Sequence, residues 1–273
     1  MTDPPEALPG DAGGPPFLLT KEYRRFAEFC DACRRHRYIG LCYGPPGVGK
    51  TLSARYYAHW DGVEPCLQAS WDLVLPPSTA WHTLLYTPPV TNTARTLAQD
   101  LQILQARWNG LVEQAQASPQ ERRRVGVHDY CELLIVDEAD RLKMPSLEQL
   151  RDRYDRRTFG LILIGMPGLE KRLARYPQLY SRIGFAHAFR PVSQEDMQDM
   201  LGHYWAERGL GGADTEKTAQ EAIAAIIRIT GGNFRLLHRL LAQISRILYV
   251  NNLHTITQEV VEAARTCLVI GTT

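Results

Sequence analysis

The chain has 273 residues, of which 44% are hydrophobic and 22% charged, and its formal net charge is +1. This length and composition predict one large globular domain, or a core domain with a small appendage, and exclude a helicase motor with two full nucleotide-binding lobes. The balanced charge leaves nucleic-acid binding open, because such a site must then come from local clusters of cations. No apolar run approaches the roughly 20 residues that span a bilayer, and the N-terminus lacks a signal-peptide pattern, so we expect a soluble cytoplasmic protein with no membrane partner.

The first element expected after the N-terminus is a helix. Residues 1–18 are rich in Pro, Gly and Asp, and we expect them to be a flexible tail. From Thr20, "TKEYRRFAEFCDACRRHR" places apolar residues at helical spacing, with Thr20 as the N-cap. Within it, Cys30 and Cys33 form a C-x-x-C next to His36. Structural zinc needs four ligands and usually a second cysteine pair, which this sequence lacks, so a role in the core is favoured over zinc.

A phosphate-binding loop follows. The short strand "YIGLCYG" leads into "GPPGVGKT", which fits G-x-x-x-x-G-K-[ST], and the helical "TLSARYYAHW" comes next. The glycines let backbone amides face phosphate oxygens, the lysine reaches the β and γ phosphates, and the threonine can ligate magnesium. The sequence therefore predicts ATP and Mg²⁺ as cofactors, with the nucleotide held by Gly44, Pro45, Pro46, Gly47, Val48, Gly49, Lys50, Thr51 and Leu52.

The middle of the chain has weaker signals. We expect residues 61–83 to be irregular, because "VLPPSTAW" interrupts any helix, and residues 83–90 to form a second strand that ends at two prolines. The segment "NTARTLAQDLQILQARWNGLVEQAQ" predicts an amphipathic helix that packs on the sheet. The basic "ERRR" at 121–124 is expected to be a loop.

The third strand carries the second chemical motif. Four consecutive apolar residues in "LLIVDEAD" predict a strand buried on both faces, as in a parallel sheet between helices. Asp137 then emerges at the carboxyl end of that strand, beside the phosphate loop, where it can hold magnesium directly or through water. Glu138 can polarise the attacking water.

The last third of the chain changes from strands to helices. A fourth strand, "FGLILIGMP", ends at Gly165 and Met166, and "FAHAFRPVS" predicts a short edge strand. From Ser193 onward all patterns are helical. This switch predicts an α/β P-loop core with a parallel sheet between helices at 19–190, and a small C-terminal helical lid at 191–273, with a boundary near Pro191.

Taken together, "GPPGVGKT", "LLIVDEAD", the arginines after the fourth strand and the helical "GGNFR" resemble the AAA+ ATPases over roughly residues 20–268. The loop differs from the A-x-T-G-x-G-K-T of DEAD-box helicases, and a small-molecule kinase would not require the later arginines. The resemblance implies that Arg235 contacts the γ-phosphate. It also implies that Arg182, in "SRI", reaches the ATP of a neighbouring subunit, so that the monomer is a poor ATPase. The alternatives for this second role are Arg172, Arg175 and Arg190.

One position departs from the family pattern. AAA+ ATPases usually place Asn, Thr or Ser at the end of the fourth strand to help orient the water, whereas this chain has Met166. A thioether cannot donate that hydrogen bond. Either a neighbouring group replaces it, or hydrolysis is slow and nucleotide binding acts chiefly as a switch.

The stretch from "DEADRL" to "LYSRIG" is similar to the transposition-regulator branch of the family: TniB, TnsC and MuB, with IstB more distant. The resemblance implies an ATP-dependent homo-oligomer, a ring or a helical filament, that assembles on double-stranded target DNA. It also implies that the protein recruits or activates a transposase, in some cases together with a target-selection protein. Candidate DNA contacts are Arg95, Arg141 and Lys143, which would touch phosphates without reading bases. The alternative for these three cations is ordinary solvated charge.

Two other functions remain open. The first is another DNA-linked AAA+ ATPase, such as a helicase loader or an initiator-like protein. The second is an ExeA-like ATPase that organises a protein assembly without DNA. Initiators normally add a winged-helix domain and ExeA-like proteins a membrane or peptidoglycan segment, so we favour the transposition regulator.

Overall fold

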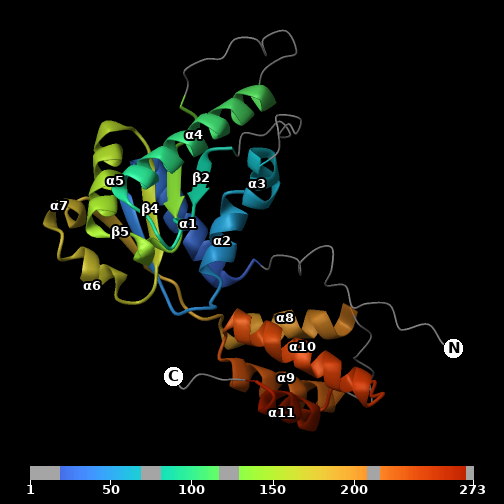
Figure 1. The fold of residues 1–273 in the computed structure, drawn as a ribbon. Helices are drawn as coiled ribbons and strands as arrows, with labels where there is room; N and C mark the ends of the chain where they lie inside the picture. The colour runs from blue at the N-terminus through green and yellow to red at the C-terminus, as the bar shows by residue number, and fades with distance from the viewer. Residues whose placement is uncertain (1–18, 69–80, 117–128, 208–215, 269–273) are drawn as a thin grey trace.

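The computed structural model describes residues 19–68, 81–116, 129–207 and 216–268 (Figure 1). Its centre is a five-stranded parallel sheet with the strand order β2-β3-β4-β1-β5. The predicted α/β core is confirmed. Because the strands are parallel, the loops that follow them gather at one end of the sheet, here called the carboxyl end. The strands are β1 (Ile39–Tyr43), β2 (Thr83–Tyr86), β3 (Leu133–Val136), β4 (Gly160–Gly165) and β5 (Ile183–Ala188).

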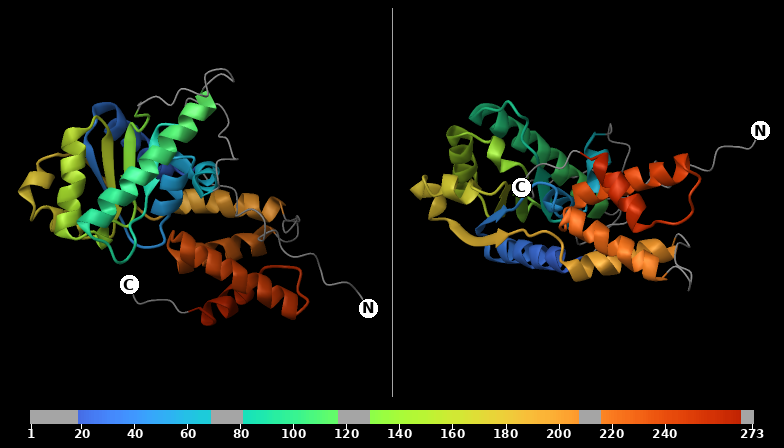
Figure 2. Two further views of the ribbon diagram at one scale, coloured as in Figure 1. Left: turned by 45° about the horizontal axis from the view of Figure 1, so that its top comes forward. Right: turned by 90° about the horizontal axis from the view of Figure 1, so that it is seen from below.

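Helices cover both faces of the sheet. Figure 2 shows α1 on one face and α4 with α5 on the other. Every residue of β3 and β4 is buried, as the apolar "LLIV" predicted for a strand enclosed on both faces. The helical elements of this part are α1 (Lys21–His36), α2 (Lys50–Tyr57), α3 (Trp60–Gln68), α4 (Ala94–Gln116), η1 (Ala139–Arg141), α5 (Met144–Arg156), α6 (Leu169–Leu173) and α7 (Pro177–Tyr180).

Helix α1 begins where the sequence predicted. The Thr20 hydroxyl accepts a hydrogen bond from the backbone N–H of Tyr23 at 3.1 Å. Cys30 and Cys33 lie in the apolar core, and a side chain on Gly40 would clash with the Cys33 sulfur. Burial raises the pKa of Cys33 to about 12, so its thiol stays protonated at neutral pH. Within the described ranges, no three His, Cys, Asp or Glu side chains form a group able to hold a metal ion.

Two predicted elements were wrong in extent. Residues 61–68, expected to be irregular, belong to α3, which forms because Trp60, Val63 and Leu67 recur at helical spacing and are buried. Pro65 lies inside this helix, and burial of that face outweighs the one hydrogen bond that proline removes. The second strand stops at Tyr86 rather than reaching the prolines. The predicted tail at 1–18 and the predicted loop at 121–124 lie outside the described residues.

The C-terminal helices form a second apolar cluster, and we call α8–α11 the lid. These helices are α8 (Gln194–Glu207), α9 (Glu216–Thr230), α10 (Phe234–Val250) and α11 (Gln258–Thr266). The first cluster ends at Phe189 and the second begins at Val192, on either side of Pro191. The Val192 N–H donates to the Gly232 carbonyl at 3.1 Å, and Gly232 has φ +81, where a side chain would clash with the Val192 carbonyl. None of the helices in the described part of the chain is long and apolar enough to cross a membrane.

Candidate nucleotide-binding site

The phosphate loop joins β1 to α2 at the carboxyl end of the sheet. Gly47 and Gly49 have φ angles of +79 and +105, in the left-handed region that favours glycine. A side chain on Gly44 would clash with the Phe189 carbonyl, because the loop starts against the segment that leads to the lid. These glycines therefore allow both the turn of the loop and its close packing.

The amine of Lys50 lies inside this loop. It donates to the carbonyls of Gly44 and Pro45, at 2.6 and 2.7 Å. Burial lowers the pKa of Lys50, while the charges of Asp137 and Asp140 oppose that shift. The amine is thus fixed at the loop, with carboxylates nearby that favour its charged form.

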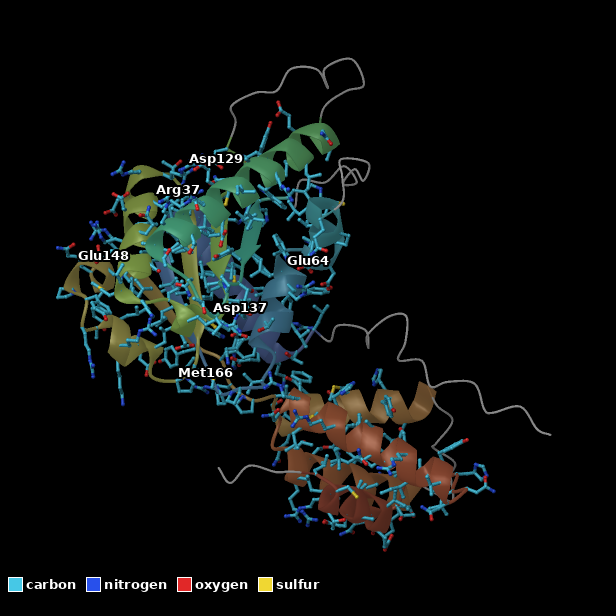
Figure 3. The ribbon with its side chains drawn as sticks, in the orientation of Figure 1. Arg37, Glu64, Asp129, Asp137, Glu148 and Met166 are labelled. Carbon is cyan, nitrogen blue, oxygen red and sulfur yellow. The ribbon has the colours of Figure 1, made fainter. Side chains whose placement is uncertain are left out.

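The two residues predicted to hold magnesium are in direct contact. The Thr51 hydroxyl donates to Asp137 Oδ2 at 2.7 Å, and Asp137 is only 3% exposed. The Asp137 N–H donates to the Tyr86 carbonyl at 2.9 Å, which ties the end of β3 to β2. Figure 3 shows Asp137 at the end of the sheet that faces the lid. A hydroxyl and a carboxylate oxygen side by side are the donor types that Mg²⁺ prefers.

Glu138 is held by a cation of the same turn. Its carboxylate forms an ion pair with Arg141, and the Arg141 guanidinium also donates to the Pro88 carbonyl at 2.8 Å. Glu138 has φ +50, a conformation that costs energy for a residue with a side chain and that occurs often at functional sites. The predicted base and one predicted DNA contact are therefore bonded to each other.

The end of β4 is organised by Asp140, a residue that sequence reasoning missed. The backbone N–H of Met166 donates to Asp140 Oδ2 at 2.6 Å, and the Met166 side chain is 40% exposed. Gly165 has no room for a side chain because the same carboxylate fills that space. Arg172 fixes the other side of Asp140 by donating to its backbone carbonyl at 2.8 Å. In the sequence, only the position of Asp140 at the end of "DEAD" could have indicated that it takes part in the site.

The lid closes directly over the phosphate loop. The Asn233 amide donates to the Pro46 carbonyl at 3.0 Å, and the Arg235 N–H donates to the Gly47 carbonyl at 3.3 Å. Asn233 also caps α10, because its side-chain oxygen accepts from the Leu236 N–H at 3.1 Å. Arg235 is therefore placed in the first turn of α10, above the loop. Asn233 was not predicted, since its partner lies 187 residues earlier.

Arg182 lies at the opposite end of the sheet, just before β5 begins. It forms a bidentate ion pair with Asp155 of α5, with Nε and Nη2 at 2.6 and 2.9 Å from the carboxylate. A strand of six residues spans about 20 Å, so Arg182 is too far from the phosphate loop of its own chain to act there. Arg172, Arg175 and Arg190 were the alternatives to Arg182 for contacting the ATP of a neighbouring subunit. Arg172 donates to backbone carbonyls of its own chain, while Arg175 and Arg190 are exposed.

The predicted DNA contacts lie in the segments that follow β2 and β3 at the carboxyl end of the sheet: Arg95 in the first turn of α4, Arg141 at the end of η1 and Lys143 just before α5. Arg95 and Lys143 are exposed, and neither forms an ion pair with any described residue. Asn92 holds these segments together, because its buried amide donates to the Arg141 carbonyl at 3.1 Å and accepts from the Ser146 hydroxyl at 3.2 Å. The structure thus brings Arg95, Arg141 and Lys143 to the carboxyl end of the sheet.

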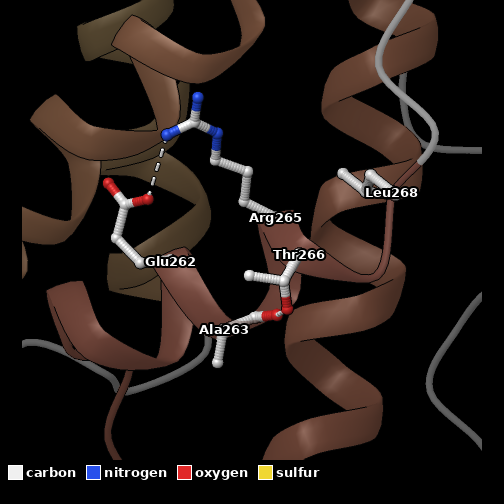
Figure 4. A pocket seen from close by; sticks show the side chains of 5 residues that line it. All are labelled: Glu262, Ala263, Arg265, Thr266 and Leu268. Carbon is white, nitrogen blue, oxygen red and sulfur yellow. Dashed lines mark hydrogen bonds and ion pairs between the residues drawn. The ribbon is translucent and has the colours of Figure 1, made fainter.

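One hollow in the described surface lies away from this site. It is shallow and follows the last turns of α11, on the part of the lid that is remote from the phosphate loop (Figures 1 and 4). Within it, Arg265 donates to Glu262 at 3.3 Å. The hollow has no contact with the residues predicted from the motifs. Its lining is Glu262, Ala263, Arg265, Thr266 and Leu268.

A parallel sheet with a phosphate loop after β1, an acidic pair after β3 and a lid over the loop defines a P-loop nucleotide-binding protein. Residues 33–173 match the AAA domain family, which is more than half of the chain. The chain is also 46% identical to a "Potential ATP-binding protein" of Staphylococcus aureus, over 93% of this chain and 97% of that one. The chain belongs to the AAA domain family, and it is an ATPase of that family.

Other similarities are more distant. The chain is 26% identical to the Mu-like prophage FluMu DNA transposition protein B of Haemophilus influenzae, over 82% of this chain and 70% of that one. Its fold is similar to the Thermotoga maritima RuvB Holliday junction branch migration motor, with a TM-score of 0.55, 16% identity, and coverage of 90% and 68%. It is also similar to Aeropyrum pernix ORC1 in complex with DNA, with a TM-score of 0.57, 19% identity, and coverage of 92% and 66%. These two structures support the fold.

Proposed function

We propose that this ATPase is an ATP-dependent, DNA-binding regulator of transposition, which oligomerises on duplex DNA and recruits or activates a transposase. The similarity to a Mu-like transposition protein B over most of the chain supports this function. The exposed cations at the carboxyl end of the sheet supply a surface for DNA phosphates.

In this proposal each residue of the site has a role in binding or hydrolysis. Lys50 and Arg235 contact the phosphates of ATP, and Thr51 with Asp137 holds Mg²⁺, which neutralises phosphate charge when bound. Glu138 orients and activates the attacking water. The role of Arg182 is to reach the ATP of the adjacent subunit, which suits its distance from its own phosphate loop.

The observation that carries the proposal is the contact between Glu138 and Arg141. Arg141 lies on the loop next to Lys143, and Asn92 links that loop to the start of α4, where Arg95 is exposed. A DNA phosphate that pairs with Arg141 competes for the guanidinium that holds Glu138. DNA binding would thereby free the base, so that duplex DNA raises the rate of ATP hydrolysis.

Binding to duplex DNA tests this function. Full-length protein is titrated with a 40-base-pair duplex of random sequence at low salt, with and without a non-hydrolysable ATP analogue, and the complexes are imaged by electron microscopy. We expect ATP-dependent oligomers on DNA and weaker binding by Arg95→Ala/Lys143→Ala. The exposed pair Arg24→Ala/Lys171→Ala is the matched control. No binding at low salt would exclude a DNA regulator and favour an assembly ATPase without DNA.

A further inference from the structure

A row of arginines runs along the exposed side of α10. Arg235, Arg239 and Arg246 are four and seven residues apart, which places them within roughly 40° of one another around the helix and spreads them over about 16 Å. All three are exposed, and none forms an ion pair with a described residue. The opposite side of the helix is apolar and packs into the lid through Leu237, Leu240 and Ile244.

The charge of α10 is unusual for this chain. The chain as a whole has 31 basic and 30 acidic residues, whereas α10 has no Asp or Glu among its 17 residues. Two other arginines of the described lid are ion-paired: Arg228 and Arg265 share the carboxylate of Glu262 in α11. The arginine row is therefore a local concentration of positive charge on a helix that has no acidic residue of its own.

We infer that Arg239 and Arg246 form a second DNA-backbone site, separate from the cations at the carboxyl end of the sheet. The inference rests on the proposed DNA function. A straight row of guanidinium groups suits a line of phosphates, which arginine binds in a bidentate manner. Arg235 begins the row at the phosphate loop, so bound ATP and bound DNA would lie at the two ends of one helix. Figures 1 and 2 also show α10 on the same side of the molecule as α4, whose first turn contains Arg95.

An acidic protein segment is the competing ligand. Tyr249 and Val250 follow the row at the end of α10, where they are 67% and 69% exposed, and such apolar groups fit a protein partner better than DNA. No large apolar side chain is exposed between Arg235 and Arg246, which favours DNA for the row itself.

The salt dependence of DNA binding tests the site. Full-length protein with a non-hydrolysable ATP analogue is titrated with a labelled 40-base-pair duplex at several salt concentrations. We expect Arg239→Ala/Arg246→Ala to reduce the slope of log K against log salt by about 2, because each phosphate contact contributes about 0.9. The control Arg228→Ala/Arg265→Ala removes the same charge from ion-paired lid positions and should keep the wild-type slope.

The outcomes separate this inference from the proposed function. An unchanged slope in the Arg239→Ala/Arg246→Ala variant, with binding still weakened by Arg95→Ala/Lys143→Ala, would overturn the second site alone. The same loss in the control double variant would also overturn it, because bulk charge would explain the effect. Absence of wild-type binding would remove the proposed function itself. If poly-L-glutamate binds the wild type and not the α10 variant while DNA binding is equal, the row is a protein-binding site and the inference fails.

Discussion

The two ends of the sheet differ in how much of a catalytic site each contains. At the carboxyl end, Lys50, Thr51 and Asp137 are already fixed by short hydrogen bonds, and the lid lies over the phosphate loop. At the opposite end, Arg182 is held on the surface by Asp155, about one strand length away. One chain therefore has the residues for binding ATP in place. Under the proposed role of Arg182, rapid hydrolysis would need the two ends of two neighbouring chains.

The largest expected effect comes from removing Arg182, at the end of the sheet opposite the phosphate loop. Arg182→Ala should reduce ATP turnover by about 10³-fold, because an arginine supplied in trans stabilises charge in the transition state. Affinity for a fluorescent ATP analogue should stay at the wild-type value. Steady-state hydrolysis and equilibrium binding measure the two quantities. Arg157→Ala, which breaks a similar surface pair with Asp129, is the control, and equal loss of turnover in it would contradict the role of Arg182.

A smaller loss of turnover is expected at the carboxyl end. Glu138→Gln removes the base and should slow hydrolysis by about 10²-fold, with ATP retained and the assembled form stabilised. Glu132→Gln, placed just before the same strand, should hydrolyse ATP normally. Single-turnover hydrolysis and light scattering report the two effects. Loss of ATP binding in Glu138→Gln would show that this residue binds nucleotide rather than activating water.

A glycine-to-alanine substitution in the phosphate loop tests the contact between that loop and the lid. Gly47→Ala forces a side chain into a position with φ +79 and against Asn233, so ATP affinity should fall by about tenfold or more. Gly62→Ala in α3, where the added group meets open space, should bind ATP as the wild type does. Isothermal titration calorimetry gives both affinities. Equal affinities would mean that the loop binds ATP without its contact to the lid.

The smallest expected effects separate the role of Asn233 as a helix N-cap from its contact with the phosphate loop. Asn233→Ala and Thr257→Ala each remove a helix N-cap of the lid, so each should lower the free energy of unfolding by about 1 kcal/mol in denaturant titrations. Only Asn233 also donates to the phosphate loop. ATP should therefore raise the melting temperature less in Asn233→Ala than in Thr257→Ala, and an equal rise would remove Asn233 from the site.

The sequence predicted those features that depend on neighbours along the chain. The buried strand β3 and the Thr20 cap follow from local patterns, and both are found in the structure. Helix α3 was missed because the prolines of "VLPPSTAW" were expected to interrupt the whole segment 61–83, although they come after Gln68. Gly62 and Pro65 also disfavour a helix locally, while the burial that stabilises α3 comes from the rest of the core.

Three missed contacts involve partners that are distant in the sequence. Asp155 lies 27 residues from Arg182, Asp140 lies 26 residues from Met166, and Asn233 meets a loop from the other end of the chain. Spacing and composition contain no information about such pairs. The roles of Glu138 and Arg235 came from motifs and stay predictions, whereas the contact of Asn233 with the phosphate loop became visible only in the fold.

An experiment that mixes two variants tests most directly whether each ATP site is shared between two subunits. Arg182→Ala and Glu138→Gln are each expected to be nearly inactive, but an equal mixture places an intact Glu138 beside an intact Arg182 at about a quarter of the subunit contacts. The account predicts that the mixture recovers ATP hydrolysis to roughly that fraction of the wild-type rate. A mixture no more active than the two variants measured separately would contradict a site shared between subunits.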